Sequence, residues 1–285
     1  MNEPMVWSPK KIEDAWEIKQ KYGSNARYIS GGTWIQLRWE SGEPVPRHLI
    51  NLGNINEMSQ IRLRTNGNGF SIIMGAASTL SACLNHPDIQ KHWPIMVNAL
   101  GGIASPAVRN QATIGGNLSF GYGDLIPALL VLDALVTWFD GKQYVTDKLI
   151  NFLKNTNESS TLVSNLLTEI LLPKAIVTTT FYKKIGRREA FSPSILTVAG
   201  TYKLNSNNEI DQPRLALGGG EELPHRLFLV EDMLQGQVPN DALWKRVHAK
   251  ILELFEPCSD RFTSSQYRKE VAANLLIAGL SGSLV

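Results

Sequence analysis

The chain has 285 residues, of which 43% are hydrophobic and 19% are charged, enough apolar material for two or three compact units. Its formal net charge is only +2, and the charges are spread along the sequence, so composition gives no sign of a nucleic-acid-binding surface. Cys83 and Cys258 are too few and too far apart to hold an iron–sulfur cluster or to staple a secreted domain. With no signal pattern and no apolar run of membrane-spanning length, we expect a cytoplasmic protein that does not bind membranes.

The N-terminal part of the sequence predicts a helix, a strand and a second helix. Ser8 and Pro9 are typical of an N-cap and a first helical turn, and Gly23 is typical of the end of that helix. A strand over 27–29 then enters a glycine loop, and a helix over 33–38 follows the loop. This order suits phosphate binding, because the first N–H groups of a helix are unpaired and its dipole is positive there.

The middle of the sequence alternates between strand and helix patterns. The sequence Asn66-Gly67-Asn68-Gly69 is typical of a hairpin turn and predicts that the strands on either side of it pair. In chain order we expect strands over 48–51, 61–64 and 70–74, helices over 89–100 and 126–135, a polar connection over 144–160 and a strand over 162–172.

A second domain is expected from Ala175 onward, because short β-rich runs replace the earlier pattern after Pro173. Thr263 and Gln266 have the spacing of a capping box and predict the start of the last helix. The predicted strands of this domain lie over 178–182, 195–204 and 215–217. The predicted domains are therefore 1–174, with subdomains of about 1–53 and 54–174, and 175–285.

Two glycine loops carry the strongest functional signal: Ser30-Gly31-Gly32-Thr33 and Thr113-Ile114-Gly115-Gly116-Asn117. Glycine has no Cβ to hold a ligand away, so consecutive main-chain N–H groups can converge on phosphate oxygens. We therefore expect both loops to present N–H groups to one diphosphate from two sides. A Gly-Gly pair alone is more often a tight turn, and neither a Rossmann G-x-G-x-x-G nor a P-loop sequence occurs in the chain.

Around these loops the sequence resembles the FAD-binding subunit of molybdenum hydroxylases, the group of xanthine dehydrogenase, carbon monoxide dehydrogenase and aldehyde oxidase. The first loop resembles the family's [AS]-G-G-T loop, and the segment from Arg109 to Leu118 resembles its R-N-x-x-T-[IL]-G-G-N-L segment. Further matches, in order, are Asp124, Pro127 to Leu130, Leu132 to Ala134, Leu167 to Pro173, Tyr182-Lys183, Arg187-Arg188, Gly218-Gly219, Pro224 and Tyr267-Arg268.

The resemblance implies an α+β protein. Its N-terminal domain is expected to have the two-subdomain FAD-binding fold of the PCMH (vanillyl-alcohol oxidase-like) type, followed by an α+β domain of the carbon monoxide dehydrogenase flavoprotein type. The implied FAD-binding residues are Ser30, Gly31, Gly32, Thr33, Trp34, Ile103, Thr113, Ile114, Gly115, Gly116, Asn117, Asp124, Leu167 and Lys183. Lys183 is expected near the pyrimidine edge of the flavin, where a cation would stabilise the charge of the reduced ring and tune its potential.

The implied function is that of a flavoprotein subunit, most like that of xanthine dehydrogenase in purine metabolism. Electrons would come from a molybdopterin subunit through an iron–sulfur subunit, reach FAD on this chain and leave to NAD, in a dimer of heterotrimers. Two alternatives stay open: a stand-alone FAD-dependent oxidoreductase, and a non-catalytic assembly subunit with a decayed flavin site. The sequence does not identify the substrate, which another subunit would select.

The segment between Asn117 and Asp124 is shorter than the family pattern, which bears on how the flavin is covered. Phe120 or Tyr122 could cover it differently, and Trp34 stands where many relatives carry a smaller or acidic residue. The five histidines lack metal-ligand spacing, and no nucleophile or paired general acid and base stands out, so we expect no metal site and no catalytic side chain. The adjacent Glu221 and Glu222 are expected in a turn.

Overall fold

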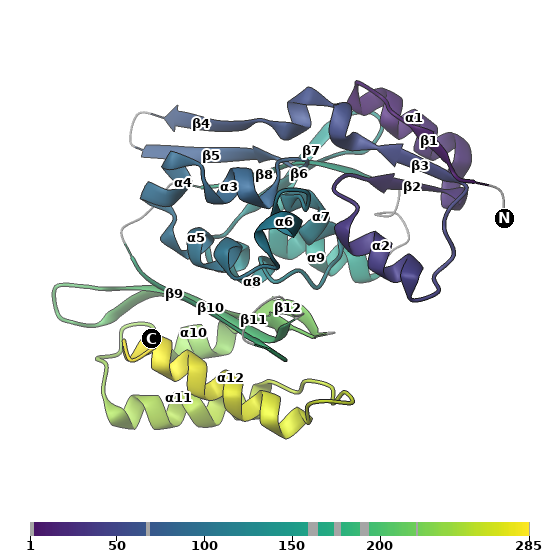
Figure 1. Ribbon diagram of the computed structural model, residues 1–285. Helices are drawn as coiled ribbons and strands as arrows, with labels where there is room; N and C mark the ends of the chain where they lie inside the picture. The colour runs from purple at the N-terminus through teal and green to yellow at the C-terminus, as the bar shows by residue number, and fades with distance from the viewer. Residues whose placement is uncertain are drawn as a thin grey trace. The chain divides into compact units, whose positions relative to one another are not determined.

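A computed structural model describes residues 3–66, 69–158, 165–173, 178–188, 194–220 and 222–284 (Figure 1). Contacts within the chain divide it into two compact units. The first unit comprises Met1–Ile89, Ser105–Gly121 and Asp133–Lys174, and the second comprises Gln90–Ala104, Tyr122–Leu132 and Ala175–Val285. Two segments that precede the expected boundary thus group with the C-terminal part of the chain. The boundary itself stays a prediction, because residues 174–177 lie outside the described ranges.

The first unit contains two sheets and several short helices. Its strands are β1 (Met5–Trp7), β2 (Ala26–Ile29), β3 (His48–Asn51), β4 (Ile61–Asn66), β5 (Gly69–Gly75), β6 (Leu135–Phe139), β7 (Tyr144–Lys148) and β8 (Leu166–Leu172). Its helices are α1 (Ile12–Tyr22), α2 (Thr33–Glu40), α3 (Leu80–Leu84), α6 (Pro106–Arg109), α7 (Ile114–Ser119) and α9 (Leu149–Glu158), with 3₁₀ turns at Gly23–Asn25, Leu52–Asn54 and Asn56–Ser59. Helix α4 (Pro87–His92) crosses from this unit into the second.

The small sheet of the first unit is parallel, in the order β1-β3-β2, and the larger one is antiparallel, in the order β4-β5-β8-β6-β7. Helix α1 buries Ile12 and Ala15. Its Lys19 ammonium donates to the carbonyl oxygens of Gly23 and Ala26 at 2.9 and 2.6 Å, which ties the end of α1 to the start of β2. That anchored end of β2 directs the chain into the first glycine loop.

The second unit contains one antiparallel sheet and five helices among its described residues. The strands are β9 (Thr179–Gly186), β10 (Ser194–Leu204), β11 (Ile210–Gly219) and β12 (Glu222–Arg226), in the order β12-β11-β10-β9. The helices lying wholly within it are α5 (Pro94–Gly101), α8 (Ile126–Val131), α10 (Phe228–Leu234), α11 (Asp241–Leu254) and α12 (Ser265–Leu280).

The two faces of the β9–β12 sheet pack against different helices. The core below the sheet in Figure 1 joins residues such as Leu196 and Leu217 to apolar side chains of α10, α11 and α12. On the other face α8 packs against β10 and β11, and a Cβ added to Gly218 would lie 2.9 Å from the Pro127 ring. Alternate residues of each strand therefore face different helices.

The start of the first helix and the continuity of the helix expected over 89–100 differ from the prediction. Helix α1 begins at Ile12 with Lys11 as its N-cap, because the chain up to Trp7 is still paired with β3 in a parallel ladder. The expected helix over 89–100 is two helices, α4 and α5, and Pro94 opens the second of them. Proline suits a first helical turn but cannot donate within a continuous helix, so the break falls there.

The expected polar connection after Tyr144 is instead strand β7 followed by helix α9. Strand β7 pairs with β6 through a turn in which the Asp140 carboxylate accepts from the N–H groups of Lys142 and Gln143, at 2.8 and 2.9 Å. At the other end of the chain, Ser264 rather than Thr263 caps α12. The Thr263 hydroxyl accepts from the Arg268 guanidinium at 3.1 Å instead.

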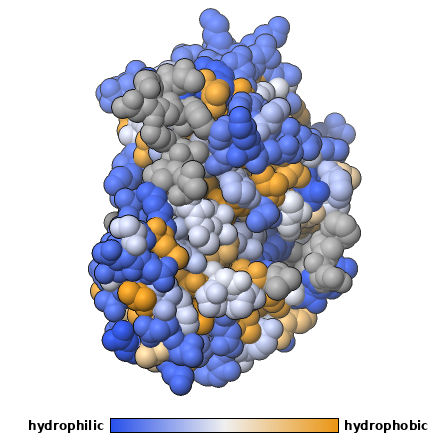
Figure 2. Space-filling view, turned by 90° about the vertical axis from the view of Figure 1, so that its left-hand side faces the viewer, coloured by the Kyte–Doolittle hydropathy of each residue, from blue (hydrophilic) through white to orange (hydrophobic). Residues whose placement is uncertain are grey.

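The helices and sheets of both units confirm the predicted α+β class. The hairpin between β4 and β5 is also confirmed by their pairing from Ile61 to Asn66, although Gly67 and Asn68 lie outside the described residues. Helix α8 ends at Val131, earlier than expected, and Asp133 follows with a left-handed φ of +51°. No described helix combines the length and the apolar character needed to cross a bilayer. Figure 2 shows a face on which hydrophilic residues predominate and hydrophobic ones form small patches.

Candidate functional site

The first glycine loop connects β2 to α2 at the carboxyl end of the parallel sheet. Gly32 is the N-cap of α2 and has a φ of +69°, a left-handed conformation that favours glycine. The N–H groups of Thr33, Trp34 and Ile35 form the first turn of α2, and none of them donates to an acceptor in the described part of the chain. These three N–H groups and the positive end of the helix dipole make this turn suitable for an anion.

The second glycine loop forms the N-terminus of α7, and its N–H groups are already engaged. The Thr113 hydroxyl is the N-cap and accepts from the N–H of Gly116 at 3.1 Å. The remaining N–H groups donate to carbonyl oxygens: Ile114 to Ser78 at 3.0 Å, Gly115 to Ala76 at 2.8 Å and Asn117 to Thr113 at 3.0 Å. The N–H groups of the second loop from Ile114 to Asn117 thus already have acceptors within the protein, and their expected contact with a diphosphate stays a prediction.

The two loops lie side by side within the first unit, as expected. A Cβ added to Gly31 would come within 1.9 Å of the Gln111 carbonyl oxygen, so the two main chains are in direct contact. Further along, the rings of Trp34 and Phe120 are in contact, with centroids 4.1 Å apart and planes inclined by 48°. Two contacts made by different residues thus join the first loop to the segment around the second.

The two glycines of the second loop are required for different reasons. A Cβ on Gly115 would lie 2.6 Å from both the Cβ and the carbonyl oxygen of Ala76, so packing within the protein excludes a side chain there. Gly116 is exposed, and the nearest atom to an added Cβ is the Thr113 hydroxyl oxygen at 3.0 Å. A side chain at 116 would thus require only a small shift of the capping hydroxyl, and the bare main chain at that position is exposed.

Leu167 lies in β8, opposite Trp138 of β6. The pairing of β8 with β5 ends at Glu169, so Leu167 lies beyond the paired part on that side. Helix α7, which begins with the second glycine loop, packs against β8. Leu167 thus lies on a strand that packs against the helix formed by the second loop.

Asp124 is in the second unit, where its groups are engaged by residues of two strands. Its carboxylate pairs with the Lys184 ammonium at 2.7 Å and accepts a hydrogen bond from the Ser194 hydroxyl. Its carbonyl oxygen accepts from the Tyr182 hydroxyl at 2.9 Å. Burial, and then the Asp124 charge, raise the pKa of Tyr182 well above its ordinary value, so this hydroxyl stays a donor.

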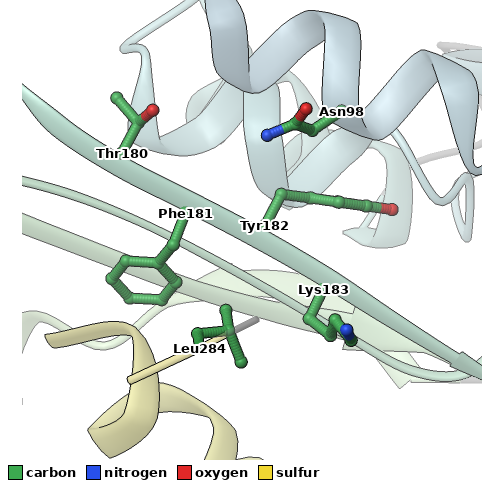
Figure 3. A pocket seen from close by; sticks show the side chains of 6 residues that line it. All are labelled: Asn98, Thr180, Phe181, Tyr182, Lys183 and Leu284. Atoms are coloured by element: carbon green, nitrogen blue, oxygen red, sulfur yellow. The ribbon is translucent and has the colours of Figure 1, made fainter. Parts of the chain in front are cut away.

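Lys183 and Lys184 point to opposite faces of β9. Lys184 faces Asp124 and also donates to the carbonyl oxygen of Gly102 at 3.2 Å. Figure 3 shows Phe181 and Lys183 on one side of β9 and Thr180 and Tyr182 on the other. All four line an open hollow of about 200 Å³, together with Asn98 and Leu284. Lys184 rather than Lys183 therefore pairs with Asp124, and the expected place of Lys183 near the flavin stays a prediction.

Ile103 is a buried residue of the second unit, next to the Gly102 carbonyl that Lys184 contacts. Sequence reasoning named Ile103 and Asp124 but missed Lys184 and Ser194. Lys184 could have been found from strand alternation, because Tyr182 and Lys184 are two residues apart and share a face. Ser194 carried no such signal, because it lies one residue before the strand that the sequence predicts over 195–204.

The other candidates of the sequence are not brought together into a site. Within the described ranges no group of three or more histidine, cysteine or carboxylate side chains could hold a metal ion. Tyr122 belongs to the second unit, whereas Phe120 belongs to the first, where it contacts Trp34. Glu222 opens β12, and Glu221 lies outside the described residues.

Comparison with known families explains the arrangement. Residues 2–175 match the family described as the FAD binding domain in molybdopterin dehydrogenase. The chain belongs to the molybdenum hydroxylase family, as its FAD-binding subunit. Residues 180–281 match the carbon monoxide dehydrogenase flavoprotein C-terminal domain, which accounts for the sheet and helices that follow β9.

Curated relatives align over most of this molybdenum hydroxylase subunit. The glyceraldehyde dehydrogenase medium chain of Sulfolobus acidocaldarius is 29% identical and covers 87% of this chain and 86% of its own. The nicotinate dehydrogenase FAD-subunit of Eubacterium barkeri is 29% identical over 81% of this chain and 79% of its own. The xanthine dehydrogenase FAD-binding subunit of Escherichia coli K12, named as putative, is 25% identical over 85% and 83%.

Solved structures share the fold of this subunit. Carbon monoxide dehydrogenase from Hydrogenophaga pseudoflava superposes with a TM-score of 0.89 at 22% identity, covering 99% of this chain and 97% of the other. Quinoline 2-oxidoreductase from Pseudomonas putida 86 gives a TM-score of 0.85 at 20% identity, covering 100% and 99%. The predicted two-subdomain FAD-binding fold with a C-terminal α+β domain is thus confirmed.

Proposed function

We propose that the first unit binds the diphosphate of FAD at the start of α2, with the second glycine loop forming the adjoining wall. The observation that carries this proposal is the set of unused N–H groups of Thr33, Trp34 and Ile35, beside a second glycine turn. The residues fit the cofactor, because an anion placed there satisfies helix N–H groups that have no other partner in the described chain.

The second loop contributes shape rather than main-chain donors in this proposal. Gly116 leaves an exposed, side-chain-free turn of α7 that a dinucleotide can approach closely. The Thr113 and Gly115 hydrogen bonds hold that turn rigid, so the wall is formed before the cofactor binds. The Leu167 main chain, beyond the paired end of β8, is a further proposed contact.

When bound, FAD supplies two-electron chemistry that no side chain of this protein can provide. The residues of this chain bind and orient the cofactor. Ile103, Asp124 and Lys183 are proposed cofactor contacts on the strength of the family motifs alone. Because the Asp124 carboxylate is engaged by Lys184 and Ser194, its proposed role is to hold a fixed hydrogen-bonding position rather than to move a proton.

We propose that electrons reach this subunit from a molybdopterin subunit through an iron–sulfur subunit and leave to NAD. The names of the relatives support a shared multi-subunit design, since they are medium chains or FAD subunits of different dehydrogenases. The relatives are named for different substrates, glyceraldehyde, nicotinate and xanthine, which supports the proposal that a partner subunit selects the substrate. A xanthine dehydrogenase of purine metabolism, assembled as a dimer of heterotrimers in the cytoplasm, is the specific form we propose.

The proposal is tested by flavin binding to the full chain. The purified protein should retain FAD or take it up after deflavination, and Gly32→Val should abolish retention because a branched side chain would fill the phosphate approach. Gly236→Val is the matched control, since Gly236 has a similar φ of +72° and nothing lies within 4 Å of an added Cβ.

Colourless protein that takes up no FAD would contradict the proposal and favour a non-catalytic assembly subunit. Equal flavin content in Gly32→Val and Gly236→Val would also contradict it. The side chain at position 32 would then have no effect on FAD beyond the backbone strain that both variants share. Turnover of a substrate by the isolated flavoprotein, without partners, would favour a stand-alone oxidoreductase.

A further inference from the structure

Trp34 is an exposed aromatic residue at the start of α2. It is the second residue of the helix, and 39% of its surface is exposed. Helix α2 contains no buried residue, so the core of the unit does not account for a large aromatic side chain at this position. Its described ring partner is Phe120, which directly follows α7, with ring centroids 4.1 Å apart.

Trp34 also carries one of the three main-chain N–H groups that have no acceptor in the described residues. The same residue therefore carries a main-chain donor suited to a phosphate and an exposed aromatic face next to it. A dinucleotide diphosphate bound at this turn has planar rings at both ends, and flat aromatic side chains stack on such rings. The Phe120 ring restricts the indole from one side, which reduces the conformational entropy that stacking would cost.

We propose that Trp34, supported by Phe120, is the stacking surface for one planar ring of the bound flavin dinucleotide. The inference rests on the proposed function, because it takes the diphosphate to bind at the start of α2. The planes of the two side chains are inclined by 48°, so a single ligand ring can lie parallel to only one of them. Trp34, the more exposed of the two, takes the ring face, and Phe120 holds the indole in place.

The test compares Trp34→Ala with Trp34→Phe in the deflavinated full chain. Stacking on an aromatic side chain contributes enough that its removal should weaken FAD binding about tenfold, equivalent to roughly 1.4 kcal/mol. Trp34→Phe should bind FAD nearly as well as the natural protein, because a flat ring is restored. Leu37→Ala is the control on the same helix, since Leu37 is 54% exposed, and it should leave the FAD dissociation constant unchanged.

Binding of ADP and of FMN tells which ring is involved. A loss in Trp34→Ala for ADP but not for FMN places adenine on the indole, and the reverse places the isoalloxazine there. In the second case the emission of bound flavin should rise in Trp34→Ala, because a stacked indole quenches it. Either outcome supports stacking.

Failure of this inference is distinguishable from failure of the proposed function. If the natural protein binds FAD and Trp34→Ala binds FAD, ADP and FMN with unchanged dissociation constants, the stacking surface is wrong while the diphosphate site stands. Equal weakening in Trp34→Ala and Trp34→Phe would also overturn it, because ring stacking would not be what was lost. If the natural protein binds none of the three, the proposed function itself is wrong.

Discussion

The two glycine loops of the first unit look alike in sequence but differ in what their N–H groups do. In the second loop the N–H groups from Ile114 to Asn117 all donate within the protein. In the first loop the N–H groups of Thr33, Trp34 and Ile35 have no acceptor in the described residues. Free donors at a helix start favour an anion, whereas engaged donors stabilise the turn itself. We therefore propose the first loop as the binding element and the second as a preformed support.

The second unit contains a similar contrast between adjacent residues of one type. Lys184 pairs with Asp124, and both side chains are largely buried, at 13% and 14% exposure. Lys183, one residue earlier, lies on the other face of β9 beside an open hollow. In both units, residues that look equivalent in a sequence motif differ in their contacts, because the local backbone directs their groups to different sides.

The largest expected effect is on stability, from Gly31→Ala. The new Cβ would lie 1.9 Å from the Gln111 carbonyl oxygen, and main chain cannot move aside easily, so we expect a loss of about 3 kcal/mol. Gly32→Ala is the comparison, since its nearest neighbour is a side-chain carbon at 3.5 Å and only the left-handed φ, costing about 1 kcal/mol, opposes it. Urea unfolding measures both, and equal losses would mean that the two loops do not touch as described.

Lys184→Met should destabilise the second unit by about 2 kcal/mol, because it leaves the Asp124 carboxylate largely buried without its cation. Lys183→Met should cost less than Lys184→Met, because the largely buried Asp124 carboxylate keeps its Lys184 partner. Thermal unfolding of the two variants checks this. A larger loss from Lys183→Met would reverse the assignment of the two faces of β9.

Gly116→Ala and Gly115→Ala together should distinguish an effect on FAD affinity from an effect on stability in the second loop. For Gly116→Ala we expect FAD binding to weaken about tenfold while stability changes by less than about 1 kcal/mol, because alanine favours the helix and the Thr113 hydroxyl, 3.0 Å from the new Cβ, has to shift only slightly. Gly115→Ala should instead lose stability, since its Cβ would lie 2.6 Å from Ala76. Calorimetric titration and urea unfolding together distinguish the two variants, and a Gly116→Ala protein with unaltered FAD affinity would remove the second loop from the site.

A smaller loss of stability than in Gly31→Ala or Lys184→Met is expected from Thr113→Val, which removes the hydroxyl that caps α7 while keeping the shape of the side chain. Loss of the hydrogen bond to the Gly116 N–H should cost about 1 kcal/mol of stability. FAD affinity should fall by less than in Gly116→Ala, because the turn of α7 becomes less rigid but no side chain enters the space that FAD would occupy. If Thr113→Val is as stable as the natural protein, the cap does not hold the second loop.

Hydrophobic periodicity and turn residues predicted most strands, because they are local signals. The fold class was instead implied by the family resemblance, and the adjacency of the loops by their shared glycine motifs. The sequence did not predict that Ala76 and Ser78 would accept the N–H groups of the second loop, since those residues are distant in sequence. Asp124 was named from the family motif, but the motif did not predict its ion pair with Lys184. That pair depends on which side chains of β9 lie on the face next to Asp124. Partners set by tertiary packing have no signature in a short motif.

Hydrogen–deuterium exchange of the full chain, with and without FAD, tests the central claim most directly. The account predicts that the N–H groups of Thr33, Trp34 and Ile35 exchange fast without FAD and become protected when it binds. Those of Ile114, Gly115 and Asn117 should already be protected without FAD, because they donate within the protein. Protection by FAD confined to the second loop, with the start of α2 unchanged, would contradict the account.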